Sequence, residues 1–207
     1  MAGLFITLEG GDGAGKTTQL ARLGRWLEAS GRTVVLTREP GGTDLGLELR
    51  QIILHRRGYI APRAEALLYA ADRAQHVATT VRPALERGEI VIQDRYIDSS
   101  VVYQGAGRVL DPDEVRDISL WAAEGLVPDV TVLLDLPPGL GRARLGERDR
   151  YDRLEAAGDD FHARVRRAYL EIAEREPERM LVVDASRDVD EVAARIRAHV
   201  EGVLGRP

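Results

Sequence analysis

Five short apolar runs, rich in β-branched residues, are spaced along the chain and predict the strands of a sheet. They are Leu4 to Leu8, Thr33 to Leu36, Ile90 to Ile92, Val130 to Leu134 and Met180 to Val183. Continuous apolar runs of this length are typical of strands buried on both faces. Segments with apolar residues at helical spacing separate them, so we expect right-handed crossovers and a five-stranded parallel sheet with helices on both faces.

Several helix ends can be placed from capping residues. Asp111 followed by Pro112 predicts an N-cap and the first helical residue, and Gly125 predicts the stop. Asp188 and Glu191 have the spacing of a capping box. One further helix is predicted to present an apolar stripe that belongs to the core, made of Phe161, Val165, Tyr169 and Ile172.

Composition narrows the class of protein. With 207 residues, 44% of them hydrophobic, the chain is expected to form a single α/β domain over residues 1–207. A net charge of -5 argues against nucleic acid as a partner and favours small phosphorylated molecules. The chain has no cysteine, no basic leader and no apolar run near the ~20 residues that span a bilayer. We therefore expect a cytoplasmic protein that does not bind membranes.

The stretch after the first predicted strand has the pattern of a phosphate-binding loop. Gly10, Gly15, Lys16 and Thr17 match the spacing of glycine, four residues, glycine, lysine and a hydroxyl residue, between a strand and a helix start. Such a loop turns backbone N–H groups and a helix N-terminus toward phosphate. The expected ATP-binding residues are Gly10, Gly11, Asp12, Gly13, Ala14, Gly15, Lys16, Thr17 and Thr18.

Lys16 is the only lysine of the chain, and every other side chain that is cationic at neutral pH is an arginine. A compact ammonium retained at this one position indicates that a planar guanidinium does not fit there. Lys16 is therefore expected to contact the transferred phosphates, while the Thr17 hydroxyl is expected to bind Mg²⁺.

Three loops that follow predicted strands carry further candidate chemistry, because ligands of open α/β sheets bind beyond the carboxyl ends of the strands. Thr37 to Thr43 holds Glu39 before a proline and two glycines, and is either a plain turn or a site. Asp94 and Arg95 end the third strand. They are either a carboxylate that orders magnesium beside a guanidinium that binds phosphate, or a simple ion pair at the strand end. Residues 141–153 are rich in arginine, and form either a solvated helix or a lid that brings positive charge over a moving phosphoryl group.

Five motifs together resemble the bacterial thymidylate kinases over nearly the whole chain. They are GGDGAGKTT from Gly10, TREPGGT from Thr37, LLYAADRAQH from Leu67, QDRYIDSSVVYQG from Gln93 and DRLE from Asp152. The resemblance implies a three-layer P-loop NTPase fold and an enzyme of dTDP biosynthesis. Such an enzyme phosphorylates dTMP to dTDP with ATP and Mg²⁺ by direct in-line transfer. It also implies a homodimer packed through helices.

The resemblance further assigns roles near the reacting phosphates. It implies a lid at roughly residues 141–156, with Arg148, Arg150 and Arg153 as unranked catalytic arginines, in agreement with a phosphate loop that contains no arginine. Asp12 would approach the 3′-hydroxyl of the acceptor, and Asp94 would order Mg²⁺ through water. Arg95 would hold the acceptor phosphate, with Arg38 and Arg50 as lesser partners and Glu39 as a further substrate contact.

For the base, the resemblance implies that Tyr69 stacks on the thymine and that Arg73, one helical turn later, binds its edge together with Gln104. Tyr103 would crowd the 2′ position and favour deoxyribose. Ser100 stands where some relatives have asparagine.

Other functions are less consistent with the sequence. A kinase for another (deoxy)nucleoside monophosphate is the nearest alternative, and only the resemblance argues against it. A GTPase switch would need an asparagine-lysine motif, but the chain has no asparagine and no second lysine. A partition-type ATPase would also need a second lysine, early in its phosphate loop. A scaffold protein would give the predicted lid arginines no function.

Overall fold

The computed structural model of the chain describes residues 3–56, 58–106, 110–146 and 158–205. Its five strands form one parallel sheet with the order β2-β3-β1-β4-β5. They are β1 (Leu4–Gly10), β2 (Val34–Arg38), β3 (Ile90–Asp94), β4 (Val130–Asp135) and β5 (Met180–Asp184). The predicted five-stranded parallel sheet is confirmed, with each strand extending one or two residues past its expected end.

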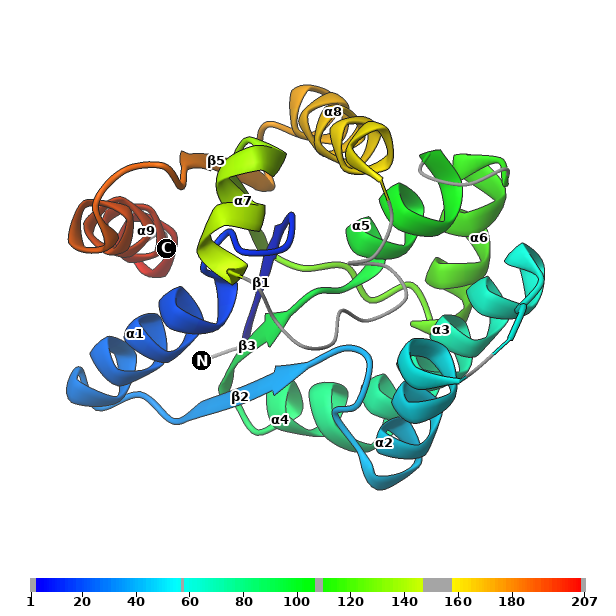
Figure 1. Cartoon of the computed structure of the whole chain (residues 1–207). Helices are drawn as coiled ribbons and strands as arrows, with labels where there is room; N and C mark the ends of the chain where they lie inside the picture. Colours follow the sequence, from blue (N-terminus) through cyan, green and yellow to red (C-terminus); the bar gives the residue numbers. More distant parts are fainter. Residues whose placement is uncertain (1–2, 57, 107–109, 147–157, 206–207) are drawn as a thin grey trace.

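Helices cover both faces of the sheet (Figure 1). The α-helices are α1 (Lys16–Ala29), α2 (Asp44–Arg50), α3 (Pro62–His76), α4 (Arg82–Glu86), α5 (Ile97–Ser100), α6 (Pro112–Ala122), α7 (Pro138–Leu145), α8 (Asp159–Arg175) and α9 (Val189–Leu204). Three π-helical turns continue α2, α3 and α5; they are η1 (Gln51–His55), η2 (Val77–Val81) and η3 (Val101–Ala106). Helices α1 and α9 pack on one face, while α4, α5 and α8 pack on the other.

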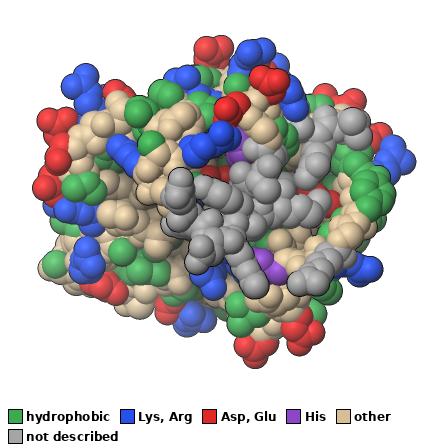
Figure 2. Space-filling model, viewed as in Figure 1, with side chains coloured by type: hydrophobic (Ala, Val, Ile, Leu, Met, Phe, Trp, Pro, Cys, Tyr) green, Lys and Arg blue, Asp and Glu red, His purple; other side chains and the backbone are tan. Residues whose placement is uncertain are grey.

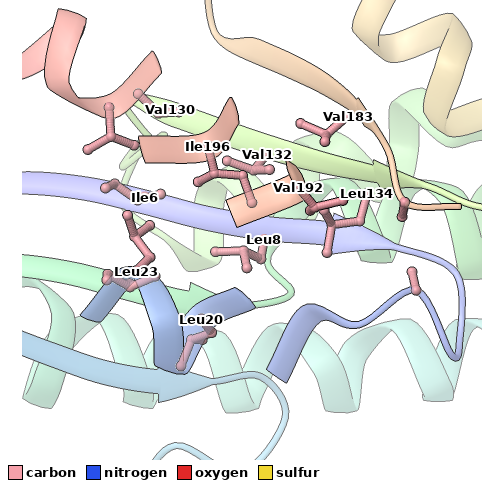
Figure 3. Close-up of a cluster of buried hydrophobic side chains, with 14 of the residues drawn as sticks. Ile6, Leu8, Leu20, Leu23, Val130, Val132, Leu134, Val183, Val192 and Ile196 are labelled. Atoms are coloured by element: carbon pink, nitrogen blue, oxygen red, sulfur yellow. The ribbon is translucent and has the colours of Figure 1, made fainter. Parts of the chain in front are cut away.

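The largest core cluster lies between the sheet and helices α1 and α9 (Figure 3). Ile6 and Leu8 of β1 meet Leu23 of α1 and Ile196 of α9, and all four side chains are almost completely buried. Because β1 is the central strand, this packing fixes the point at which its carboxyl end, and therefore the phosphate loop, leaves the sheet. Around the rim of one face of the molecule, acidic and basic side chains are interspersed (Figure 2).

The expectation that every strand is buried on both faces is wrong for β2. Its residues are half-buried or exposed, and Leu36 keeps 44% of its surface accessible. The reason is topological, because β2 is an edge strand that pairs with β3 on one side. Composition identified the strand but not its place in the sheet.

The capping residues predicted the helix ends well. Asp111 caps α6 by accepting a hydrogen bond from the Asp113 N–H, and Gly125, with a φ of 72°, follows the last turn. Asp188 caps α9 but accepts from the N–H of Asp190, one residue before the position that a capping box uses. Across the described ranges, no helix combines the length and apolar character needed to cross a bilayer.

Candidate active site

The phosphate loop links the end of β1 to the start of α1. Gly13 and Gly15 have φ values of 76° and 90°, a region that favours glycine, and Gly15 is the N-cap of the helix. The Lys16 Nζ donates to the carbonyl oxygens of Gly10 (3.0 Å) and Gly11 (2.9 Å), so the lysine folds back over the loop. Burial, followed by the charge of Arg95, lowers the pKa of Lys16 below its ordinary value.

Arg95 occupies the turn after β3, where its own φ is 66°. Its guanidinium donates to the Asp12 carboxylate (2.5 Å), the Gly10 carbonyl (3.3 Å) and the Ser99 hydroxyl (3.2 Å). It also lies 4.9 Å from the centre of the Tyr103 ring, in reach of a cation–π interaction. Burial opposes the charge of Asp12, but Arg95 and Lys16 outweigh it and hold the pKa of this carboxyl below its ordinary value. Asp12 and Arg95, two predicted site residues, therefore lie together.

Thr17 and Asp94, the predicted metal-binding residues, also lie side by side. The Thr17 hydroxyl donates to Asp94 Oδ2 at 3.3 Å, and Asp94 Oδ1 is buried with no hydrogen-bond partner among the described residues. A free carboxylate oxygen beside a hydroxyl fits Mg²⁺, which takes one or two protein ligands and completes its shell with water and phosphate oxygens. Within the residues that the structure describes, no group of three or more His, Cys, Asp or Glu side chains could form an all-protein metal site.

One cavity of about 480 Å³ joins these groups to the residues predicted to read the base. Its lining includes Asp12, Gly13, Gly15, Lys16, Thr17, Thr18, Glu39, Pro40, Arg50, Tyr69, Arg73, Asp94, Arg95, Ser99, Ser100, Tyr103, Gln104 and Arg144. Two buried donors in this lining, Arg73 Nη1 and the Tyr103 hydroxyl, have no partner within the described residues. Buried donors are normally paired, so these atoms point to a polar ligand.

The residues predicted to bind the base come from α3, α5 and η3. Tyr69 and Arg73 both lie on α3 and both line the cavity, as their spacing predicted. Arg73 Nη2 donates to the Ser100 hydroxyl at 3.1 Å, so Ser100 contacts the arginine that was predicted to bind the base. Gln104 is fixed by a buried hydrogen bond from its Nε2 to Glu65 Oε1 (3.0 Å), a partner that the sequence pattern did not indicate.

Glu39, which was predicted to contact the substrate, is bound on both carboxylate oxygens by other side chains of the protein. Its two carboxylate oxygens accept from Arg73 Nε (3.0 Å) and pair with His76 Nδ1 (2.9 Å), and all three side chains are buried. The second ring nitrogen of His76 lies 2.7 Å from the Thr37 hydroxyl. Thr37 itself belongs to β2, so this site begins at a strand end and not in a free turn.

The two lesser phosphate candidates line one cavity together, but only one of them also lines the main cavity. Arg50 lines the main cavity and donates to the Pro40 carbonyl at 2.8 Å. Arg38 is the last residue of β2, is exposed, and lines a neighbouring cavity of about 480 Å³ together with Thr17, Asp94 and Arg95. The prediction for Arg38 is therefore less directly supported than the one for Arg50.

The sequence analysis missed Glu9, a fully buried carboxyl in β1. It accepts from the backbone N–H of Tyr96 (2.7 Å), the Ser99 hydroxyl (2.6 Å) and the Tyr169 hydroxyl (2.9 Å). Burial and the nearby Asp98 raise its pKa above the ordinary value. A charged residue inside an apolar strand was the available signal. Tyr169 was predicted as a core residue, but its hydroxyl belongs to this network.

The predicted lid, at roughly residues 141–156, falls only partly within the described residues. Residues 141–145 are part of helix α7, whose Arg144 lines the main cavity. Arg148, Arg150 and Arg153 lie outside the described residues. The lid and its catalytic arginines therefore stay a prediction.

A phosphate loop after β1, a carboxylate at the end of β3 and a cavity between them define a P-loop nucleotide-binding protein of the α/β class. The family model for thymidylate kinase matches residues 8–196, and the chain belongs to this family. It is 73% identical to a thymidylate kinase of Leifsonia xyli subsp. xyli over 97% of this chain and 95% of that protein. It is 55% identical to one of Deinococcus radiodurans over 96% of each chain. The crystal structure of thymidylate kinase from Ehrlichia chaffeensis has a TM-score of 0.79 at 30% identity, and covers 97% of this chain and 99% of that one.

Proposed function

We propose that this chain phosphorylates dTMP to dTDP, with ATP as the phosphoryl donor. Membership of the thymidylate kinase family supports the reaction, and does not favour another monophosphate as acceptor. The observation that carries the proposal is that one cavity is lined both by the phosphate loop and by Tyr69 and Arg73. A single cavity of this kind can hold donor and acceptor with their reacting phosphates adjacent, which is the main requirement of in-line transfer.

On the donor side, residues Gly10 to Thr18 are proposed to hold the phosphates of ATP. Lys16 would exchange its two carbonyl partners for the β- and γ-phosphate oxygens, and its charge would stabilise the transferred phosphoryl group. Thr17 and Asp94 are proposed to hold Mg²⁺, Asp94 through water. That ion, when bound, would supply positive charge that neutralises the phosphates.

On the acceptor side, Arg95 is proposed to bind the dTMP phosphate, with Arg50 and Arg38 contributing from the loop after β2. Asp12 would lie by the 3′-hydroxyl of the acceptor. Its carboxylate also accepts a hydrogen bond from Arg95 and would keep that guanidinium in place before dTMP binds. The nucleophile is an oxygen of the acceptor phosphate, so the protein needs no covalent intermediate. The chain's part in the reaction is to orient both nucleotides and to exclude water from between them.

The base is proposed to stack on Tyr69 and to bind Arg73 and Gln104 through its polar edge. The unpaired Nη1 of Arg73 supports this role, since the other guanidinium nitrogens already have partners in Glu39 and Ser100. Glu39 would then act through Arg73. The buried hydroxyl of Tyr103 is proposed to crowd the 2′ position of the sugar.

Four further assignments rest on the sequence, two of them on the resemblance and two on composition. Arg148, Arg150 and Arg153 are proposed to be catalytic arginines of a lid, and residues 1–207 to be one kinase domain. A homodimer is proposed, supported by the exposed apolar side chains of Leu67 on α3 and Trp121 on α6, two helices that pack together. The protein is proposed to act in the cytoplasm.

The test is to incubate the protein with Mg²⁺-ATP and a panel of monophosphates, and to identify the diphosphate that forms. We expect dTDP to be the main product and Lys16→Ala to lower kcat at least ~10²-fold, the scale for removing a charge-stabilising donor. Arg25→Ala, on the exposed surface of the same helix, is the matched control and should retain normal kinetics. Another preferred acceptor would refute the dTMP assignment, and normal turnover of the Lys16 variant would refute the phosphate-loop mechanism.

A further inference from the structure

The phosphate loop rests directly on the backbone of helix α7. A Cβ atom placed on Gly141 would overlap the Asp12 carbonyl oxygen, and one placed on Gly13 would overlap the Gly141 carbonyl oxygen. In both directions the obstructing atom belongs to a backbone, which cannot rotate away as the end of a flexible side chain can. The peptide between Asp12 and Gly13 therefore packs against α7 at a distance that neither residue could keep with a side chain.

The glycine at position 141 is not explained by its own conformation. Gly141 lies inside α7, is buried, and has none of the positive φ values found at Gly13 and Gly15. Glycine in a helix interior is less stable than alanine by roughly 0.5–1 kcal/mol. Gly139, two residues earlier in the same helix, is exposed, and a Cβ there would meet no atom within 4 Å. Close approach to the phosphate loop is what separates the two positions.

The loop segment held in this way carries groups that line the main cavity. Gly13 and Asp12 both face this cavity, and the Asp12 carboxylate accepts from Arg95. The same helix contributes Arg144 and Leu145 to the cavity lining. A side chain at position 141 would push the Asp12 carbonyl away from α7. The N–H groups of the phosphate loop would then move relative to the rest of the site.

We infer that Gly141 is a positioning residue, which seats the phosphate loop on α7 and so sets the geometry of the donor phosphates. The inference deepens the proposed function and rests on it for the identity of the donor. It assigns Gly141 no contact with either nucleotide. Its effect passes through the Asp12–Gly13 peptide.

The experiment compares Gly141→Ala with Gly139→Ala, a pair that adds the same methyl group to the same helix. Binding of ATP and of dTMP is measured separately by calorimetry, together with the melting temperature. We expect Gly139→Ala to bind both nucleotides like the unmodified chain. Gly141→Ala should bind ATP at least ~10-fold more weakly, since the loss of a single hydrogen bond to a charged phosphate oxygen is on that scale. Its dTMP affinity should fall by a smaller factor than its ATP affinity, because Tyr69, Arg73 and Gln104 lie on α3 and η3 and only Asp12, with its partner Arg95, links the acceptor to the shifted loop.

The double variant Gly139→Ala/Gly141→Ala is the control for loss of folding. The substitution at 139 should raise the stability of the helix, and it leaves the contact between the new Cβ at 141 and the Asp12 carbonyl in place. Unchanged ATP affinity in a folded Gly141→Ala or double variant would overturn the inference. Equal weakening of ATP and dTMP, in step with a lower melting temperature, would also overturn it and leave Gly141 a structural residue. Because ATP binding is measured without an acceptor, the outcome does not depend on whether dTMP is the preferred monophosphate.

Discussion

Asp72 should make the stability of this protein decrease with pH. Its side chain is buried on α3, where Oδ1 accepts from the Gly41 N–H at 3.1 Å. Its other oxygen, Oδ2, is buried without a partner in the described part of the chain. Burial and the neighbouring charge of Glu39 raise the pKa of Asp72 from 3.8 to about 6, against the smaller opposing effects of the Gly41 hydrogen bond, His76 and Arg73.

The sign follows from which state binds the proton more tightly. The folded chain holds the proton of Asp72 up to about pH 6, whereas the unfolded chain releases it near pH 3.8. The stabilising contribution is therefore complete below pH 3.8 and is lost as the pH rises through about 6. A pKa rise of this size corresponds to roughly 3 kcal/mol in total, of which about 1.4 kcal/mol should be lost between about pH 5 and pH 8.

Asp72→Asn removes the charge and keeps an oxygen that can accept from Gly41. Its amide group sits where Oδ2 has no partner, which adds a penalty of about 1–3 kcal/mol that does not vary with pH. The informative quantity is therefore the difference in unfolding free energy between variant and unmodified chain, measured by urea denaturation at several pH values. We expect this difference to shift in favour of the variant by about 1.4 kcal/mol from about pH 5 to pH 8.

Asp117→Asn, at an exposed position of α6, is the matched control and should alter the unfolding free energy by less than ~0.5 kcal/mol throughout. A difference between the Asp72 variant and the unmodified chain that stays constant with pH would refute the reasoning. So would a shift of the opposite sign, because it would mean that the folded state favours the charged carboxylate.

Further predictions concern base selection and the Glu9 network. Tyr69→Phe should change kcat/KM for dTMP little. Tyr69→Ala should lower kcat/KM by an amount equivalent to about 1–3 kcal/mol of lost transition-state stabilisation, because the base loses its stacking partner. Gln104→Ala should cost about 1–3 kcal/mol and reduce the preference over deoxycytidylate; an unchanged preference across all three variants would mean that the base is bound elsewhere. Tyr169→Phe should lower the unfolding free energy by about 1–3 kcal/mol, because Glu9 and Ser99 lose a buried partner, and equal stability would contradict this account.

Features that depend on neighbours in sequence could be predicted well. The phosphate loop needs glycines, a lysine and a hydroxyl within nine residues, and a strand before them. The N-caps at Asp111 and Asp188 likewise depend on one side chain and the next turn of backbone. Tyr69 and Arg73 share a helix, so their common direction follows from helical geometry.

Features that depend on distant residues could not be predicted in the same way. Glu9 and Tyr169 are 160 residues apart and meet only because α8 packs against β4 and β5, the first of which is a neighbour of β1 in the sheet. Gln104 and Glu65 are brought together by the packing of η3 and α3. No spacing rule links such pairs, so the sequence identified the residues that line the main cavity more readily than those that hold them in place.

Glu39 illustrates why this distinction matters for mechanism. Its place in a loop beside a phosphate site made direct contact with substrate the natural expectation. In the structure both of its oxygens are already engaged, by Arg73 and His76, and it is only 4% exposed. A substitution such as Glu39→Gln would therefore act on substrate binding by weakening the hold on the Arg73 guanidinium, which the Ser100 hydroxyl and the Tyr96 ring would then orient. Its effect should disappear in an Arg73→Ala background, whereas a direct contact between Glu39 and substrate would add to the loss of Arg73.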